Sequence, residues 1–508
     1  MRKIVTLFLL VPFVLSAQVK TLANLSRGQL YSYEEIYDFD NNIRGYILLF
    51  QTDKIAKATY ELEYVVLDEN LNKVTNGFLQ ETKAESWPLK AESINVEAQL
   101  YGTKLLLEFS DTRAGRLHFF YRYRILDLKT NTISDPFIFN KQEIKHNPDM
   151  SRKTQETENT MSEPIMILEG IGMVAKASWV NKKEGRTKQY FARFDDNFKE
   201  MWRWVYDDEA VKTKHHNNPY PICSDKDVVV FFNQFGVSEY YRQENDYSLF
   251  FISANTGELL NEYHLPDVDK FAYREVDTKI IADKIVVMGN FSRKTKGGLI
   301  DDTHNIGLFQ FEFDKKTGQL LNSQRMPWTS LADRIPIDEW GRVDKEGYMY
   351  IHKMLRLSNG NTIAVAETFR DKPVATNNMY FLLLDDKLQA KEVFEVSKFR
   401  NKFPTVNLNS SQIKEYGLFD FMTYQTMGDE EYLFYFSDNE KKSVNRRKNT
   451  LFGIVSYADG KFARQTLDLK TETSTIHAMN AKKGYLLLME DFDEEGEKPE
   501  LRLEKINY

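Results

Sequence analysis

Cysteine, long apolar segments and an excess of charge of one sign are all scarce in this chain of 508 residues. Its single cysteine, Cys223, excludes an intramolecular disulfide, so packing must stabilise the fold, and we expect Cys223 to be a small buried strand residue. The net charge of −7 argues against a nucleic-acid-binding protein, because contacts to a phosphate backbone need a strongly basic surface.

Familiar catalytic motifs are missing as well. The sequence contains no nucleophile elbow, no H-E-x-x-H pair, no P-loop and no cysteine-based site. We therefore predict no catalytic residue, no metal site and no cofactor.

The N-terminus carries the clearest segment that is present. Arg2 and Lys3 precede an apolar run over residues 4–15, which ends in Ser16-Ala17-Gln18. This pattern predicts a secretory signal peptide over residues 1–17, cleaved after Ala17, because about a dozen apolar residues are fewer than the roughly 20 of a membrane-spanning helix. An uncleaved anchor is the alternative. No later run approaches that length, so we predict no transmembrane segment and a periplasmic or secreted protein.

A short apolar run recurs along the rest of the chain. Its copies cover residues 46–50, 105–107, 172–176, 228–232, 285–288, 363–366, 432–436 and 485–489. A continuous run, in contrast to an alternating one, indicates a strand that is buried on both faces. Apolar runs that recur at this spacing along a chain are typical of propeller blades or solenoids.

The clearest repeat unit spans residues 348–396. It reads as four strands, A to D, over residues 348–357, 362–369, 379–384 and 388–396, with Asn359-Gly360 as the first turn. Hairpins like that between strands C and D recur in seven units, and the eighth unit lacks its fourth strand. The extended residues 19–25 near the N-terminus can supply that strand and close the ring. We therefore predict a single all-β propeller domain over residues 18–508.

Two other architectures are compatible with parts of this pattern. A pair of β-sandwich domains would also contain many strands, but sandwich strands with one solvated face should alternate between apolar and polar residues. Most of the recurring runs do not alternate, so eight four-stranded blades are favoured. Seven blades remain an alternative if the first or last unit is a separate hairpin.

Two hairpins carry a resemblance to a known class. Residues 255–260, NTGELL, and 316–321, KTGQLL, resemble the D-x-x-T-G-x-x-L-W hairpins of quinoprotein-alcohol-dehydrogenase-like propellers, although Asn261 and Asn322 replace the tryptophan. This resemblance implies the propeller fold only. The whole chain is also similar to an uncharacterised exported family of Bacteroidota with a domain of unknown function, judged by its Ala17-Gln18 ending and its Tyr/Phe/Lys/Asn-rich strands. That family implies no known activity.

Loop lengths indicate where a ligand would bind. The AB and CD turns are short, whereas the BC and DA connections, such as residues 328–347, are long and varied. Binding groups usually lie on loops of a rigid scaffold, so we expect the BC/DA face to bind a protein or glycan of the cell envelope.

Two DA connections supply candidate ligand-binding residues. One contains the adjacent His215 and His216, for which an ordinary polar loop is the alternative, since neighbours on an extended strand face opposite ways. The other is an aromatic and charged mixture that suits a sugar or peptide, or else plugs the ring with its tryptophans buried. Its candidates are Trp328, Arg334, Asp338, Glu339, Trp340 and Arg342.

The favoured function is therefore a non-enzymatic exported binding protein. The alternative is a carbohydrate-active hydrolase or lyase with its site at the mouth of the ring, in which Asp338 and Glu339 are the carboxylates. Adjacency in sequence does not place two carboxyl groups across a sugar, as that chemistry needs.

Overall fold

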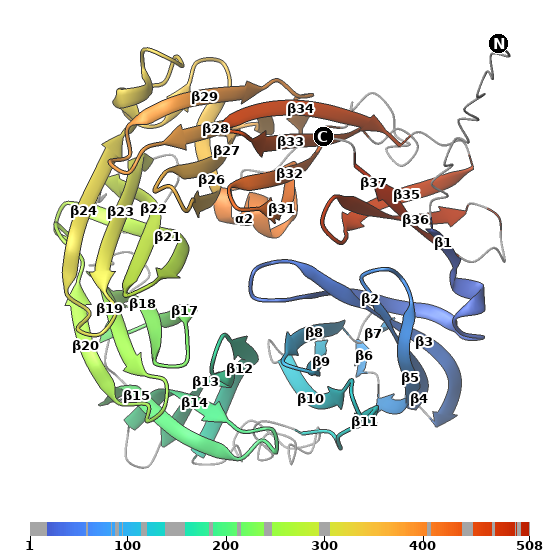
Figure 1. The fold of residues 1–508 in the computed structure, drawn as a ribbon. Coiled ribbons are helices and arrows are strands. Elements are labelled where there is room, and N and C mark those ends of the chain that lie inside the picture. The colour runs from blue at the N-terminus through green and yellow to red at the C-terminus, as the bar shows by residue number, and fades with distance from the viewer. Residues whose placement is uncertain are drawn as a thin grey trace, which may run out of the picture.

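The computed structural model describes residues 18–506 except for 57–58, 83, 87–90, 94, 113–118, 138–157, 182–185, 211–214, 238–245, 294–304, 404–407, 439–450, 470–472, 493 and 495–498. In this part of the chain, eight blades of four main strands each stand around a central axis as a β-propeller (Figure 1), and short additional strands join the sheets of blades 4 and 6. The predicted all-β class and the count of eight blades are confirmed. The predicted signal peptide, residues 1–17, lies outside the described residues. No helix among those described is long and apolar enough to cross a membrane.

The first four blades follow the chain in order, each from an inner strand to an outer one. Blade 1 contains β2 (Gln29–Tyr37), β3 (Ile43–Ala56), β4 (Thr59–Asp68) and β5 (Lys73–Thr82); blade 2 contains β8 (Asn95–Tyr101), β9 (Lys104–Thr112), β10 (Phe119–Asp127) and β11 (Thr132–Ile133); blade 3 contains β12 (Glu158–Leu168), β13 (Gly172–Asn181), β14 (Arg186–Phe194) and β15 (Glu200–Ala210); blade 4 contains β17 (Pro219–Ser224), β18 (Val228–Val237), β19 (Asp246–Ser253) and β20 (Leu259–His264). The short hairpin of β6 (Ala84–Ser86) and β7 (Ala91–Ser93) links blades 1 and 2.

The remaining blades repeat this order. Blade 5 contains β21 (Phe271–Ile281), β22 (Lys284–Arg293), β23 (Asn305–Asp314) and β24 (Leu320–Pro327); blade 6 contains β26 (Gly347–Arg356), β27 (Thr362–Asp371), β28 (Val374–Leu384) and β29 (Ala390–Val396); blade 7 contains β31 (Phe421–Gly428), β32 (Glu431–Ser437), β33 (Leu451–Ala458) and β34 (Lys461–Asp468); blade 8 contains β35 (Ser474–Asn480), β36 (Tyr485–Phe492), β37 (Glu500–Lys505) and β1 (Gln18–Thr21).

The ring closes by pairing its two ends, as predicted. β1 is the outer strand of blade 8 and lies antiparallel to β37, with Gln18 opposite Leu503 and Thr21 opposite Glu500. Figure 1 shows this N-terminal strand beside the last strands of the chain. The pairing covers an edge that β37 would otherwise expose.

The second strand of each blade is apolar on both faces because it packs against both neighbouring blades. In β3, Tyr46, Leu48 and Phe50 pack with Leu487 of blade 8. The intervening residues Ile47 and Leu49 belong to a different cluster, which they share with strands of blade 2. Successive side chains of a strand point to opposite faces, so both faces of β3 need apolar residues.

An aspartate at the end of a strand organises several of the tight turns. Asp68 Oδ1 accepts hydrogen bonds from the backbone N–H groups of Asn70 and Asn72, at 2.8 and 2.7 Å. Leu71, between them, has a φ of 62°. Such a side-chain acceptor mimics a backbone turn and fixes the hairpin geometry. The same arrangement recurs around Asp195 and Asp385.

Blade 6 departs from the prediction in one connection. Its strand C begins at Val374, five residues earlier than expected, and pairs with β27 up to Asp371. The BC connection of this blade is therefore the two-residue turn Lys372-Pro373. The long BC connections of other blades made a longer loop the expectation here.

Candidate functional site

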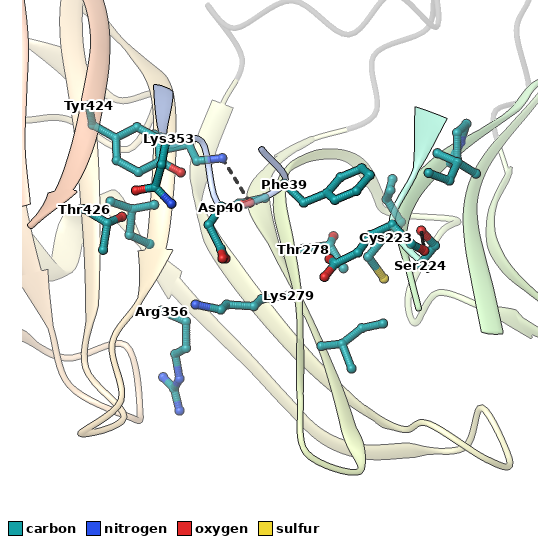
Figure 2. A pocket seen from close by; sticks show the side chains of 18 of the residues that line it. Phe39, Asp40, Cys223, Ser224, Thr278, Lys279, Lys353, Arg356, Tyr424 and Thr426 are labelled. Carbon is teal, nitrogen blue, oxygen red and sulfur yellow. Dashed lines mark hydrogen bonds and ion pairs between the residues drawn. The ribbon is translucent and has the colours of Figure 1, made fainter. Parts of the chain in front are cut away.

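The turns between the first and second strands of the blades form one end of the ring, which we call the AB-turn end. A cavity of about 600 Å³ opens at the ring centre on this end; we call it the ring-centre cavity (Figure 2). Seven of the eight blades line it, all except blade 2. Its lining includes Phe39, Asp40, Glu169, Cys223, Asp277, Lys279, Lys353, Arg356, Tyr424, Thr426, Tyr432 and Lys483.

The turn between β2 and β3 places an aromatic ring and a carboxylate at this cavity. Asp38 Oδ1 accepts the backbone N–H of Asn42 at 2.8 Å, and Asn41 Nδ2 reaches across to donate to the backbone oxygen of Tyr424 in blade 7 at 3.0 Å. In Figure 1 the tip of this hairpin projects into the middle of the ring. Phe39, 47% exposed, and Asp40 lie in the turn, so both are presented to a ligand on an anchored loop.

An ion pair between two blades forms part of the cavity wall. Lys353 Nζ of β26 lies 3.2 Å from Asp277 Oδ1 of β21, drawn as a dashed line in Figure 2. Burial raises the pKa of the Asp277 carboxyl above its ordinary value although Lys353 is adjacent. Burial also opposes the charge on Lys353, but Asp277, Tyr424 and Glu275 together outweigh it and the pKa of Lys353 is raised. The ammonium group also lies 5.5 Å from the ring centroid of Tyr424.

The remaining charges at the cavity are of both signs. Asp40 and Glu169 contribute carboxylates, and Lys279, Arg356 and Lys483 contribute cations. Burial, then the neighbouring Asp40, raises the pKa of Glu169. A lining that offers donors and acceptors in similar number suits a ligand rich in hydroxyl groups, which both donate and accept.

Cys223 lies on β17, a strand as expected, and is half-buried at the same cavity. Burial, then the carboxylate of Glu275, raises the pKa of its thiol. The thiol is therefore protonated at neutral pH, a form that is a poor nucleophile and a poor metal ligand.

The structure disperses the candidates of residues 328–342. Trp328 begins a 3-10 helix, Trp328–Leu331, and is completely buried in the core between blades 5 and 6. Its Nε1 donates to the backbone oxygen of Asn305 at 3.1 Å. Arg334 instead donates to the backbone oxygen of Lys391 at the outer strand of blade 6. Trp328 therefore has no surface exposed to a ligand.

The other four candidates of this connection share one turn. Asp338 Oδ1 accepts the backbone N–H groups of Trp340 and Arg342, both at 2.9 Å. Glu339 Oε2 lies 3.0 Å from Arg293 Nη2, and the Arg293 guanidinium lies 4.9 Å from the ring centroid of Trp340. Both carboxylates are thus engaged by groups of the protein itself, as is typical of a turn with a structural role.

The two histidines lie in a separate place. His215 and His216 form the short strand β16 (His215–His216), opposite Val237 and Gly236 of β18 in blade 4. Their ligand-binding role stays a prediction, as does that of Arg334, Asp338, Glu339, Trp340 and Arg342. Among the residues described, no group of three or more His, Cys, Asp or Glu side chains is arranged to hold a metal ion.

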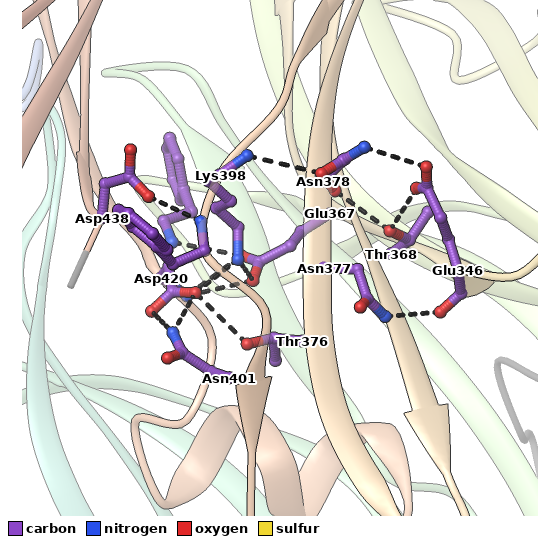
Figure 3. A network of polar contacts seen from close by, with 12 residues as sticks. Glu346, Glu367, Thr368, Thr376, Asn377, Asn378, Lys398, Asn401, Asp420 and Asp438 are labelled. Carbon is purple, nitrogen blue, oxygen red and sulfur yellow. Dashed lines mark hydrogen bonds and ion pairs between the residues drawn. The ribbon is translucent and has the colours of Figure 1, made fainter. Parts of the chain in front are cut away.

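A buried polar network holds the connection between blades 6 and 7 (Figure 3). This connection includes β30 (Asn401–Lys402) and α2 (Ser410–Glu415). The ammonium group of Lys398 contacts the carboxylates of Glu367 and Asp420. Asn401 Nδ2 donates to both carboxylate oxygens of Asp420 at 2.7 Å. The network fastens a long DA connection to the blade that precedes it.

Sequence reasoning missed the ring-centre cavity because it placed function at the end with long loops. The signal was nonetheless present in the innermost strands. Residues 274–279, REVDTK, place charged residues at alternate positions of a strand, whereas each second strand contains a continuous apolar run. A charged residue at every second position of an innermost strand points into the channel, as Asp277 and Lys279 do here.

Solved structures resemble this chain only distantly. The β-propeller domain of the Trilobed protease from Pyrococcus furiosus is 9% identical, with 82% of this chain and 96% of that chain covered, at a TM-score of 0.34. Polysaccharide lyase Uly1 is 11% identical over 81% and 89% of the two chains, with a TM-score of 0.40. Porphyromonas gingivalis dipeptidyl peptidase 4 is 10% identical over 92% of this chain and 57% of that one, with a TM-score of 0.41. At these scores they say nothing about function.

The comparison with protein families identifies the family of this chain but gives no activity for it. No curated protein matches the chain. The resemblance to quinoprotein-type propellers and an origin in Bacteroidota stay predictions. One family model matches residues 1–378 and again residues 376–507, which together cover nearly the whole chain. This β-propeller therefore belongs to the family of unknown function DUF6770.

Proposed function

We propose that this protein is an exported, non-enzymatic binding protein and that a glycan is bound in the ring-centre cavity. The carrying observation is the cavity of about 600 Å³, whose rim presents the exposed ring of Phe39 and whose walls offer charges of both signs. An apolar ring face combined with convergent polar groups is the usual composition of a site for a small polar ligand. A folded protein domain cannot enter a cavity of this size, which favours a glycan over a protein.

Export is part of this proposal. Cleavage after Ala17 would leave Gln18 as the first residue, and Gln18 is also the first residue of the ring-closing strand β1. The mature chain would then keep every residue of that strand. Subcellular fractionation and the intact mass of the mature protein test this point, and a mass that includes residues 1–17 would contradict it.

The enzymatic alternative has less support from the geometry. A hydrolase or lyase needs carboxyl groups free to act on a sugar, but Asp338 accepts two backbone hydrogen bonds and Glu339 pairs with Arg293. The protein-binding role of the BC and DA connections stays a prediction, and parts of several of these connections lie outside the described residues.

A glycan array followed by calorimetry tests the binding proposal. Wild-type protein should bind at least one glycan, and Phe39→Ala and Asp40→Asn should each weaken that binding at least tenfold, since they remove the stacking surface and one acceptor. Tyr416→Ala is the matched control, because Tyr416 is an aromatic residue 62% exposed at the end of α2. An array without any binder, or equal loss in the control, would overturn the proposal.

A further inference from the structure

A second hollow lies beside the ring-centre cavity. A groove of about 440 Å³ runs over the AB turns of blades 5, 6 and 7; we call it the radial groove. The cavity and the groove have five lining residues in common: Lys279, Ile280, Arg356, Thr426 and Tyr432. The cavity and the groove therefore adjoin at these residues.

The far wall of the radial groove is built before any ligand arrives. Glu430, in the AB turn of blade 7, accepts hydrogen bonds from the AB turn of blade 6. Its Oε1 accepts from Ser358 Oγ at 2.6 Å and from the backbone N–H of Asn359 at 2.8 Å, and its Oε2 accepts from Asn359 Nδ2 at 2.7 Å. Three bonds to one carboxylate lock the two turns together, so little ordering entropy is lost when a ligand binds there.

Polar side chains mark the junction between cavity and groove. Arg356 Nη1 donates to Gln310 Oε1 at 3.1 Å, and its Nη2 lies 3.7 Å from Glu312 Oε1. Lys284 Nζ takes the other oxygen of Glu312 at 3.2 Å. Lys279 is exposed and makes no ion pair with the described residues. The junction thus holds a fixed guanidinium and a lysine that can donate to a ligand passing between the two hollows.

The inner end of the cavity differs from the groove. Five innermost strands line the cavity. On each of them the lining residues begin at the AB turn and reach only to about mid-strand, for example to Pro221, Asp277, Lys353 and Tyr424. The radial groove, by contrast, leads out across the surface. We infer that the terminal sugar of a glycan chain occupies the cavity and that the following units lie in the radial groove, so the site recognises a chain end. This inference rests on the proposed function, because it takes the glycan-binding role of the cavity as given.

Calorimetry with oligosaccharides of defined length tests the inference. The probes are gluco-, xylo-, manno- and N-acetylglucosamine oligomers of one to six units. For a series that binds, the affinity should rise at least tenfold from one unit to four and then level off, as the groove fills. Converting the reducing end to an alditol, or placing a 4-O-methyl group on the non-reducing end, should abolish binding in one case and spare it in the other.

Two substitutions in blade 5 distinguish binding in the radial groove from binding elsewhere on the surface. Ile281 is 39% exposed and lines the groove but not the cavity, so Ile281→Trp should fill the groove and reduce the tetramer-to-monomer affinity ratio towards one. Leu321 is 53% exposed on the outer strand β24, and Leu321→Trp should leave that ratio unchanged.

The possible failures are distinguishable. If single sugars bind as well as tetramers, or if neither end modification matters, the chain-end inference is wrong while the glycan-binding function stands. If no sugar of any length binds, both proposals are wrong. They are also wrong if peptides bind instead and Phe39→Ala abolishes that binding.

Discussion

The ammonium group of Lys398 lies 3.1 Å from the carboxylate of Glu367, and both side chains are completely shielded from solvent. Lys398 enters from the connection after β29, while Glu367 lies on β27 of the same blade. The backbone N–H of Asp420 also donates to Glu367, at 3.0 Å to Oε2. His352 Nε2 lies 3.3 Å from the same oxygen. One buried carboxylate thus holds both ends of a long connection.

Removing the cation from this network should be strongly destabilising. Lys398→Met leaves Glu367 and Asp420 buried without their counter-charge, and breaking a buried pair in this way costs roughly 3–5 kcal/mol of unfolding free energy. Urea unfolding measures the loss. Lys387→Met, at an exposed lysine of the same blade, should change the unfolding free energy by less than about 0.5 kcal/mol. An equal loss of unfolding free energy in the two variants would show that the network does not stabilise the fold.

Ring closure by β1 should contribute measurably to stability. Deleting residues 18–21 removes about four backbone pairs at roughly 0.5–1 kcal/mol each, so we expect a loss of roughly 2–4 kcal/mol, together with self-association through the exposed edge of β37. Replacing the four residues with alanine keeps the backbone hydrogen bonds and should preserve most of the stability. Thermal unfolding and size-exclusion chromatography report the two effects. A deletion variant as stable as the alanine variant would contradict the closing role.

The turn of residues 338–342 requires glycine at one position for two reasons. Gly341 has a φ of 69°, and a Cβ there would lie 2.6 Å from Nε1 of the buried Trp328. Gly341→Ala should therefore cost the backbone strain of about 1 kcal/mol and a further 1–3 kcal/mol, roughly, for displacing the indole. At Gly102, φ is 58° and no atom lies within 4 Å of the added Cβ, so Gly102→Ala should cost only the backbone strain. Denaturant unfolding of the pair isolates the steric part.

A buried carboxyl group near the cavity should make stability depend on pH. Burial raises the pKa of Glu275 to about 7, against a hydrogen bond from Thr278 that lowers it. The folded state therefore holds this proton more tightly than the unfolded state does. The contribution of protonated Glu275 to the unfolding free energy is complete below the unfolded pKa of 4.5. It is lost as the pH rises through about 7. The unfolding free energy of the wild type, measured relative to Glu275→Gln, should fall between pH 5 and pH 8. A constant difference would refute the assignment.

The candidate site shows where sequence reasoning stops. Charged residues such as Asp277 and Lys279 were visible in the sequence, but nothing local indicates that β21 is an innermost strand, or that Lys353, 76 residues later, lies beside it. Trp328 and Asp338 have residue types suited to a ligand. Trp328 is buried by the packing of blades 5 and 6 and donates to the backbone of Asn305, whereas the exposed Asp338 accepts backbone hydrogen bonds within its own turn.

The sequence alone determined the repeat, its eight copies and the closing strand. Each of these follows from local physics: apolar runs such as residues 46–50 need burial on two faces, Asp and Gly mark the turns, and an unpaired strand at one end requires a partner. Only the tertiary structure decided that the cavity opens at the end with short turns and that a hairpin tip carrying Phe39 reaches into it. That outcome depends on contacts between distant blades, such as Asn41 with Tyr424, and periodicity carries no information about which blades meet at the centre of a ring.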